Sequence, residues 1–596
     1  MTSTRVFNQA GRALAFSIFS LAGCNAIVGL DKLQLSDGAA DSAGTDAGGQ
    51  TDALTGGDGG RAAKGGQGGG PAAGGTAGNS VSGGAAGAEV LSAAGDAGSP
   101  AVAGDCTTNQ ECTDRLTSGA GGEGGTTGST VAAVCVKLPT PHCAPLLSED
   151  CTGITGDYLN DHAIVIGSLF SVKGATAATN LPRQQSAALA VEQINDAGGV
   201  PAGDTSANGR PLVLVSCDES TNLVRAATHL VSDLHVPAIV GPNTSQDTLD
   251  VSTKVTVPGG TVVMSPTGVA SSIASLTDND LTWLMVPSDV QRAPLMIAQI
   301  NALETSLKAD RGQKTVKLGI VFRNDALGIG TRTALSDLVL NGKSLADPVN
   351  LNALVQIDPY NGADVNQQAI VSKYLTFAPD IIVLAGTAEA VSKVMVPLEA
   401  QWPTDNPNRP SYVLIDSTKV PELLTAATNN DDLRQRVRGT GITPGPAGKD
   451  TPAETFTNFQ VDYSVRYGAS ATISGMGPSH DAAYAIGLAL AATRAQPVSG
   501  ASVAQGLRKL AGGAMKIKAI GPNVLPAFQK LAAGDTITAV GTFGMLDWDA
   551  NGAVKGGTLE MWCIGGPTTK PAYGSSGLYF DIKTQTQSGA YVQCAP

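Results

Sequence analysis

Short apolar runs alternate with helix-like segments through residues 160–270, and this alternation limits the folds that the chain can adopt. The run Ala-Ile-Val-Ile-Gly at 163–167 is typical of a buried strand. Residues 184–196 then place apolar side chains on one side of a predicted helix, which Gly198-Gly199 would end. The same pattern predicts strands at 212–215, 238–240 and 261–264 and helices at 223–234 and 247–255. Strands that alternate with helices predict a parallel α/β sheet.

The alternation begins again after residue 310, which predicts a second, similar lobe. Its strands are predicted at 316–322, 381–384, 411–415 and 439–442, and its helices at 328–340 and 365–377. Ligands of open α/β sheets lie at the carboxyl ends of the strands. The loop Ser265-Pro266-Thr267-Gly268-Val269 follows one such strand and is therefore expected to face a ligand.

Catalytic and metal-dependent uses of these segments fit the sequence poorly. Ser265 lacks the glycines of a G-x-S-x-G nucleophile elbow. Gly328-Ile329-Gly330 lacks the third glycine of a nucleotide-binding loop. Asp547 and Asp549 have no glutamate at the twelfth position of a calcium loop. A net charge of −13 argues against nucleic acid as a partner. We predict a protein that is not an enzyme and needs no cofactor or metal.

The first 24 residues are predicted to be an export signal. Arg5 and Arg12 make the start basic, and the apolar stretch 13–21 is too short to span a bilayer. The ending Leu-Ala-Gly-Cys resembles a bacterial lipobox, which implies lipidation of Cys24 and cleavage before it. An ordinary signal peptide with a chance cysteine is the alternative. Lipidation would anchor the protein in the envelope of a Gram-negative-type bacterium, in the periplasm or at the outer membrane.

Residues 31–104 consist of Gly, Ala, Ser, Thr and Asp with almost no large apolar side chains. Such a segment cannot bury enough apolar surface to offset the entropy of ordering. We therefore predict a flexible tether between the lipid anchor and the folded part of the chain.

Eight cysteines remain after Cys24, and an even number in an exported protein predicts disulfides. They are Cys106, Cys112, Cys135, Cys143, Cys151, Cys217, Cys563 and Cys594. The first five lie in a segment too short and too rich in glycine to form a core, which predicts a small disulfide-rich module. Zinc is the competing reading, although the segment has no C-x-x-C pair. Because five is an odd number, one cysteine must pair outward, and we predict Cys151–Cys217, with Cys563–Cys594 closing the C-terminal tail.

Several segments between residues 162 and 560 follow one another in an order and spacing that identify a protein family. They are Ile164–Gly167, Ala190–Val200, Cys217-Asp218-Glu219, Val240-Gly241-Pro242, Ser265-Pro266, Val286–Asp289, Asn324–Gly328 and Gly544–Gly552. In these segments the chain resembles the type I periplasmic binding proteins, specifically the leucine/isoleucine/valine-binding branch of ABC-transporter solute receptors. The resemblance implies two Rossmann-like lobes joined by a hinge, which close around a solute.

The resemblance also implies which residues contact the solute. Ser245 matches a hydroxyl that binds a carboxylate, Gly268 matches a residue that offers backbone groups, and Asp416 with Ser417 matches the acid that meets an ammonium group. The complete set of expected contacts is Thr244, Ser245, Ser265, Thr267, Gly268, Val269, Leu327, Thr387, Asp416 and Ser417.

Three positions depart from the pattern of the amino-acid receptors. Val269 stands where these receptors usually carry a threonine, and Leu327 and Thr387 stand where aromatic side chains usually cover the ligand. Thr267 could supply a replacement hydroxyl. The departures weaken the assignment to amino acids, so amides, urea-like compounds and small carboxylates stay open.

The predicted organisation has five parts. They are a signal peptide at 1–23, an anchor and tether at 24–104, a cysteine-rich module at 105–159, a two-lobed domain at 160–562 and a tail at 563–596. Lobe 1 is expected at 160–290 with a late return, and lobe 2 at 291–540. The predicted function is capture of a small polar solute, an amino acid or a related compound, for delivery to an ABC permease. A ligand-sensing receptor subunit and a cell-envelope structural protein with a degenerate cleft are the alternatives.

Overall fold

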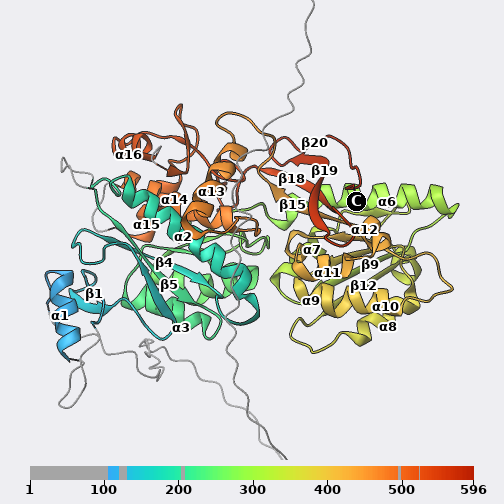
Figure 1. Ribbon diagram of the computed structural model, residues 1–596, viewed down its shortest axis with the longest axis horizontal. Coiled ribbons are helices and arrows are strands. Elements are labelled where there is room, and N and C mark those ends of the chain that lie inside the picture. Colours follow the sequence, from blue (N-terminus) through green and yellow to red (C-terminus); the bar gives the residue numbers. More distant parts are fainter. Residues whose placement is uncertain (1–104, 120–129, 203–208, 494–497, 522–523, 596) are drawn as a thin grey trace, which may run out of the picture. The chain divides into compact units, whose positions relative to one another are not determined.

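A computed structural model of the chain describes residues 105–119, 130–202, 209–493, 498–521 and 524–595 (Figure 1). All of them belong to one unit, Ala93–Pro596. The predicted signal peptide, Cys24 and the tether lie outside the described residues. No helix in the described ranges combines the length and the apolar character that crossing a membrane requires.

The first described segment is a small module that two disulfides hold together. Helix α1 (Asn109–Gly119) packs on an antiparallel pair, β1 (Ala133–Val136) and β2 (His142–Pro145). The disulfides are Cys106–Cys135 and Cys112–Cys143. The sulfur atoms of Cys106, Cys112 and Cys143 lie within 4.8 Å of one another, but each is bonded in a disulfide. The predicted disulfide-rich module is confirmed.

The predicted pairing of Cys151 with Cys217 is also confirmed, and it joins the module to the first sheet. Cys151 begins β3 (Cys151–Thr155), which pairs antiparallel with β5 (Leu212–Asp218). The first sheet therefore starts inside the segment that the sequence assigned to the module. The disulfide lies at the point where these two strands face each other, Cys151 opposite Cys217.

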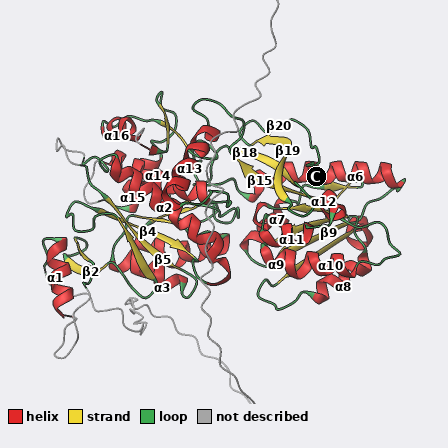
Figure 2. Ribbon diagram, in the orientation of Figure 1, coloured by secondary structure: helices red, strands yellow, loops and turns green. Residues whose placement is uncertain are grey.

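The first sheet has the strand order β3-β5-β4-β6-β7-β8. Strands β4 (Ile164–Phe170), β6 (Ala238–Val240), β7 (Val262–Ser265) and β8 (Thr282–Leu284) run parallel with β5. Neighbouring side chains of a strand point to opposite faces. Phe170 accordingly packs among α2 (Ala177–Asp196) and α14 (Met476–Thr493), whereas Leu169 packs with α3 (Leu223–Thr228) and α4 (Ser245–Val251). Helices on both faces explain the nearly continuous apolar runs of these strands (Figure 2).

The second sheet has the order β12-β9-β13-β14-β15-β18-β19-β20. Its parallel part consists of β9 (Leu318–Arg323), β12 (Val355–Tyr360), β13 (Ile381–Ala385), β14 (Ser411–Leu414) and β15 (Val437–Thr443). Helices α6 (Asp289–Arg311) and α7 (Ala326–Ala334) pack on one face. The other face carries α8 (Gln368–Phe377), α10 (Val396–Gln401), α11 (Pro421–Ala427) and α12 (Asp431–Arg436). The prediction of two α/β lobes is confirmed.

The predicted extent of the second lobe is wrong. Helices α13 (Pro452–Tyr467), α14, α15 (Gly500–Leu507) and α16 (Val524–Ala532) precede residue 540, as do β16 (Lys516–Lys518) and β17 (Thr538–Val540). The core of the first sheet includes residues of α14, α15 and α16, so this segment belongs to the first lobe. Helix α14 is buried around almost its whole circumference. Such a helix needs apolar neighbours on every side, and the first sheet with α2, α15 and α16 supplies them.

Residues 563–596 are not a separate tail, as the sequence analysis expected. Strands β18 (Thr558–Gly565), β19 (Ala572–Asp581) and β20 (Thr586–Ser588) extend the second sheet in antiparallel fashion. The predicted disulfide Cys563–Cys594 is confirmed, and it fastens the chain's end to β18.

Three chain segments connect the two lobes. They lead from β8 to α6, from β15 to α13 and from β17 to β18. Val286 lies in the first of these segments, Ile442 near the end of β15 and Leu559 near the start of β18, and all three belong to one apolar cluster. We call this cluster the hinge cluster; its residues are Val269, Val286, Leu295, Ile442, Leu559, Met561, Leu578, Phe580 and Ile582, with Leu327, Phe543 and Tyr591 packed against them.

Candidate functional site

Ser265 shapes the loop that follows β7, and its side chain is fully buried. Its hydroxyl donates to the carbonyl of Pro242 at 2.7 Å and accepts from the N–H of Gly268 at 3.1 Å. A Cβ atom on Gly268 would lie 2.6 Å from Ser265 Oγ, so the loop requires glycine at this position. The Ser265 side chain therefore supports the loop and does not point to a solute.

Ser245 joins the loops that follow β6 and β7. It begins α4, is 2% exposed, and its Oγ accepts from the N–H groups of Val269 at 3.0 Å and Ala270 at 3.2 Å. Thr244, directly before it, caps α4 by accepting from the N–H of Asp247 at 3.0 Å, and it is exposed. Ser245 thus holds the loop directly after Gly268, the residue that the resemblance expected to offer backbone groups to a solute.

Val269 and Leu327 pack in the hinge cluster. The carbonyl of Val269 also accepts from the N–H of Asp289 at 2.7 Å, which ties the loop to the start of α6. Apolar contacts between the lobes thus occupy the two positions where a hydroxyl and an aromatic side chain were expected.

Thr267 begins a chain of hydrogen bonds that the sequence did not reveal. Its hydroxyl donates to the carbonyl of Asn243 at 2.8 Å. The side-chain amide of Asn243 donates to Asn180 Oδ1 at 2.7 Å, and Arg183 Nη1 donates to the same oxygen at 2.9 Å. The loop after β7 is therefore connected to the first turns of α2.

Arg183 continues this chain to the second sheet. Its Nε donates to the carbonyl of Ser474 at 2.7 Å, and Ser474 Oγ donates to Asp416 Oδ2 at 3.4 Å. Asp416 follows β14, and Arg292 Nη1 of α6 lies 3.8 Å from its Oδ2. We call the seven residues the bridging network; they are Asn180, Arg183, Asn243, Thr267, Arg292, Asp416 and Ser474. The network spans from the carboxyl ends of the first sheet's strands to those of the second.

The bridging network carries two guanidinium groups and one carboxylate. Burial lowers the pKa of Arg183 to about 10, although the charge of Asp416 opposes the shift. Burial also lowers the pKa of Arg292, against the charges of Asp416 and Asp289. Arginine guanidinium groups remain charged in proteins, so the network holds two cations beside the single carboxylate of Asp416, and Asp289 acts on Arg292 from outside the network. Guanidinium groups bind carboxylates through paired, charge-assisted hydrogen bonds, and such a site therefore favours an anionic group.

Sequence reasoning missed Asn180, Arg183, Asn243, Arg292 and Ser474. Asn180 and Arg183 lie in the first turns of α2, before the predicted start of that helix at residue 184, and Arg292 lies in α6, a helix that was not predicted. One signal for Arg292 was available in the sequence, because this charged residue lies three positions after the recognised segment Val286–Asp289. In the structure it is 9% exposed.

Thr387 and Ser417 lie at the carboxyl edge of the second sheet, but their hydrogen bonds belong to a different group. Arg323 Nη1 donates to Thr387 Oγ1 at 3.2 Å, and Ser417 Oγ donates to the carbonyl of Gly386 at 2.7 Å. Glu389 accepts from the N–H of Thr387 at 3.1 Å. The structure therefore brings Thr267 and Asp416 into one network and leaves Thr387 and Ser417 beside it.

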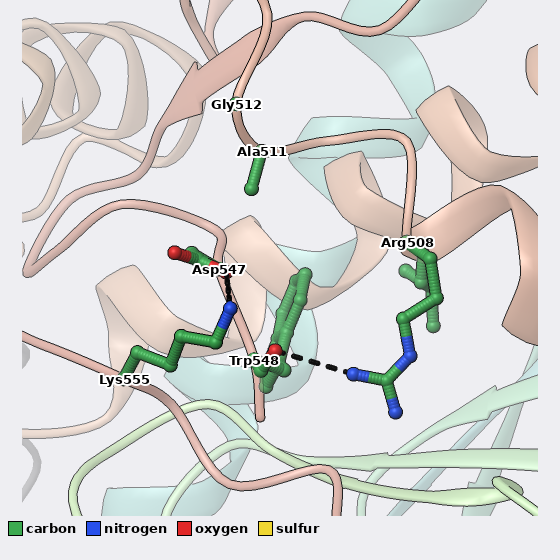
Figure 3. Close-up of a pocket in the computed structure, with 7 residues that line it drawn as sticks. Arg508, Ala511, Gly512, Asp547, Trp548 and Lys555 are labelled. Carbon is green, nitrogen blue, oxygen red and sulfur yellow. Dashed lines mark hydrogen bonds and ion pairs between the residues drawn. The ribbon is translucent and has the colours of Figure 1, made fainter. Parts of the chain in front are cut away.

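A hollow of about 230 Å³ lies elsewhere in the first lobe, between residues 507–512 and 547–555 (Figure 3). Lys555 Nζ pairs with Asp547 Oδ1 at 2.9 Å across it, and Arg508 Nη1 donates to the carbonyl of Trp548 at 3.2 Å. These charged groups already have partners within the protein, and none belongs to the bridging network.

Comparisons with known proteins agree with this fold. Residues 163–395 match the family model described as periplasmic binding protein. No curated protein matches the chain. A periplasmic binding protein type 1 from Bordetella pertussis Tohama I is 17% identical with a TM-score of 0.50, covering 69% of this chain and 100% of that one.

Two further solved structures are similar. LivJ from Streptococcus pneumoniae, in complex with isoleucine, is 17% identical with a TM-score of 0.48, and the match covers 69% of this chain and 99% of that one. The leucine-binding protein LivK from Thermotoga maritima is 14% identical with a TM-score of 0.48, and the match covers 69% of this chain and 97% of that one. The family match and the two-lobed topology together confirm that the chain resembles the type I periplasmic binding proteins and has their fold.

Proposed function

We propose that the protein is a lipid-anchored receptor of the cell envelope, which captures a small polar solute between its lobes for delivery to an ABC permease. An amino acid or a related carboxylate is the solute class that we infer. The observation that carries this proposal is the bridging network, because it joins polar groups from the ligand-facing edges of both sheets.

The charges of the bridging network support a solute with a carboxylate. Arg292 of α6 is acted on by the carboxylates of Asp416 and Asp289, whereas Arg183 of the first lobe is acted on by Asp416 alone and forms no ion pair in the described part of the chain. A solute carboxylate would provide a partner for Arg183. Closure of the lobes would then be coupled to binding, because the network depends on residues from both lobes.

The hinge cluster favours a second candidate, an envelope protein whose fold serves a structural or interaction role. Val269 and Leu327 fill space between the lobes with apolar side chains, and Ser245 Oγ is already engaged by two backbone N–H groups. A protein of this class would keep its lobes together without any solute.

Thermal unfolding of the full-length protein separates the two candidates. The probes are the twenty proteinogenic amino acids, their amides and small mono- and dicarboxylates. A ligand at 100 times its dissociation constant stabilises the native state by about 2.7 kcal/mol, which is a readily measured shift. A shift confined to carboxylate-bearing probes supports the receptor. Absence of any shift across the panel favours the structural candidate.

A further inference from the structure

Glu219 is a buried carboxylate that pairs with no cation among the described residues. It follows β5, and its N–H donates to the carbonyl of Phe170 at 3.1 Å, which fixes it beside the end of β4. The residue is 7% exposed, and neither carboxylate oxygen has a side-chain hydrogen-bond partner in the described part of the chain; the main chain of Ser171 is the polar group that lowers its pKa. Burial of a polar group without a partner is costly, so an unpartnered carboxylate is a candidate ligand contact.

The neighbours of Glu219 increase this cost. Burial raises its pKa well above the ordinary value, the nearby charges of Asp247 and Asp218 add to the rise, and the main chain of Ser171 offsets a part of it. Lys173 provides no relief, because its Nζ is 3.2 Å from Asp218 Oδ2. Asp247 lies in the first turn of α4 and accepts from the Thr244 hydroxyl at 2.5 Å. Among these acids, Asp218 pairs with Lys173, whereas Glu219 forms no ion pair in the described part of the chain.

Glu219 adjoins the bridging network. The carbonyl of Ser171, the residue after β4, accepts from Asn180 Nδ2 at 3.0 Å, and Asn180 in turn holds Arg183. The main chain at Ser171 therefore lies between the carboxylate of Glu219 and the guanidinium of Arg183.

The same acidic group faces the second lobe. The N–H of Ala326 donates to Gln246 Oε1 at 3.4 Å, so the start of α7 meets the start of α4. Asp247, next to Gln246, is influenced by the charges of Arg323 and Asp325 from the second lobe. Asp247, whose charge acts on Glu219, thus lies where the first lobe meets the second.

We propose that Glu219, with Asp247 beside it, forms the subsite for the ammonium group of the solute, while Arg183 and Arg292 bind its carboxylate. This assignment rests on the proposed solute-binding function. It replaces Asp416 in the role that the resemblance implied, because Arg292 and Arg183 already face the Asp416 carboxylate. An ammonium group at Asp416 would meet two guanidinium groups, whereas at Glu219 it would meet a carboxylate that forms no ion pair in the described part of the chain.

The test uses the full-length protein, with Glu219→Gln as the variant and Glu422→Gln as the matched control. Glu422 is an exposed acid at the start of α11, outside both groups. Isothermal titration measures each of the twenty amino acids and, for every one that binds, the carboxylate that lacks its ammonium group. L-leucine with 4-methylpentanoate and L-glutamate with glutarate are two such pairs.

The proposal predicts that Glu219→Gln weakens binding of the amino acid about ten- to hundredfold, as expected when a charged partner is lost. It also predicts that the same substitution leaves the affinity of the deaminated carboxylate within about threefold of wild type, and that Glu422→Gln changes neither. Equal loss for both members of a pair, or no loss for either, overturns the ammonium subsite alone.

Two other results would contradict the proposed function or the chemical identity of the subsite. If none of the probes binds the wild-type protein, the proposed function and the subsite both fail. If Ca²⁺ alone stabilises the wild type and Glu219→Gln abolishes that effect, the acidic group is a metal site and the ammonium assignment is wrong.

Discussion

Arg292 Nη1 and Asp416 Oδ2 lie 3.8 Å apart, and they join the first turns of α6 to the carboxyl end of β14. Both side chains are about nine-tenths buried, at 10% and 13% exposed. Breaking a buried ion pair by removing one partner leaves the other charge without compensation. Asp416 is therefore, in our account, a structural counter-charge in the site.

Replacement of Asp416 with Asn is expected to lower the free energy of unfolding by about 2 kcal/mol, because it leaves Arg292 and Arg183 without their carboxylate. The same variant is expected to bind simple carboxylates at least as tightly as wild type. Urea denaturation and isothermal titration with 4-methylpentanoate and glutarate measure the two effects. A complete loss of carboxylate binding in a folded variant would show that Asp416 contacts the solute directly.

Replacement of Ser245 with Ala should destabilise the protein by about 2–3 kcal/mol. The change leaves the buried N–H groups of Val269 and Ala270 without an acceptor. The exposed neighbour Thr244 is the control, since loss of its capping bond costs about 1 kcal/mol. Chemical denaturation of the two alanine variants gives the comparison. Equal losses would mean that the Ser245 hydroxyl does not hold the loop.

Binding should distinguish Ser245 from Thr267 as well. Ser245→Ala loosens the loop that carries the backbone donors, whereas Thr267→Ala removes one hydrogen bond to the Asn243 carbonyl. We expect Ser245→Ala to weaken binding of any solute found in the thermal screen by about tenfold. Thr267→Ala should weaken it by about threefold, which is half of the tenfold effect in free energy. Isothermal titration measures both, and a reversed order would contradict the assignment of Ser245.

Glu219 should make the protein less stable at neutral pH than at pH 4. Because the folded state raises the pKa of this carboxyl above its ordinary 4.5, the folded state retains the proton after the unfolded state has lost it. Stability is therefore intact below pH 4.5 and falls as pH rises toward the folded pKa. Glu219→Gln should unfold at higher urea concentration than wild type at pH 7 and at the same concentration at pH 4. A variant less stable than wild type at pH 7 would indicate that the carboxylate has a stabilising partner.

The disulfide Cys151–Cys217 closes a longer loop than the other three described disulfides, with a sequence separation of 66. Replacement of both cysteines with serine is expected to cost about 4 kcal/mol, mainly by freeing the unfolded chain. Thermal unfolding of the double variant measures the loss. An unchanged unfolding temperature would mean that the module is not joined to the sheet as described.

The sequence predicted the two α/β lobes well because the strand runs from 163 to 442 are buried on both faces and therefore almost continuously apolar. It misplaced the lobe boundary because helix α14 has no polar face, and such a helix fits any apolar surface. Strands β19 and β20 were taken for a tail because they carry exposed polar residues at the edge of the sheet, and every residue of β20 is exposed.

The site was predicted only in part, for a related reason. Thr267 and Asp416 follow strands, and the rule for α/β sheets places such residues near a ligand. Arg183 and Asn180 instead come from the first turns of α2, and their proximity to Ser474 depends on a chain segment about 290 residues away. Local patterns carry no information about a contact of that kind.

The central claim is that the bridging network binds the carboxylate of a solute. Titration of the full-length protein with amino acids tests it most directly, with Arg183→Met as the variant and the surface substitution Arg466→Gln as its control. Arg466 pairs with Glu192 and is half exposed, so its loss should leave binding intact. The account predicts one solute molecule per wild-type chain, unchanged affinity in Arg466→Gln and a loss of about a hundredfold in Arg183→Met. Equal affinity in wild type and Arg183→Met, with both proteins folded, would contradict it.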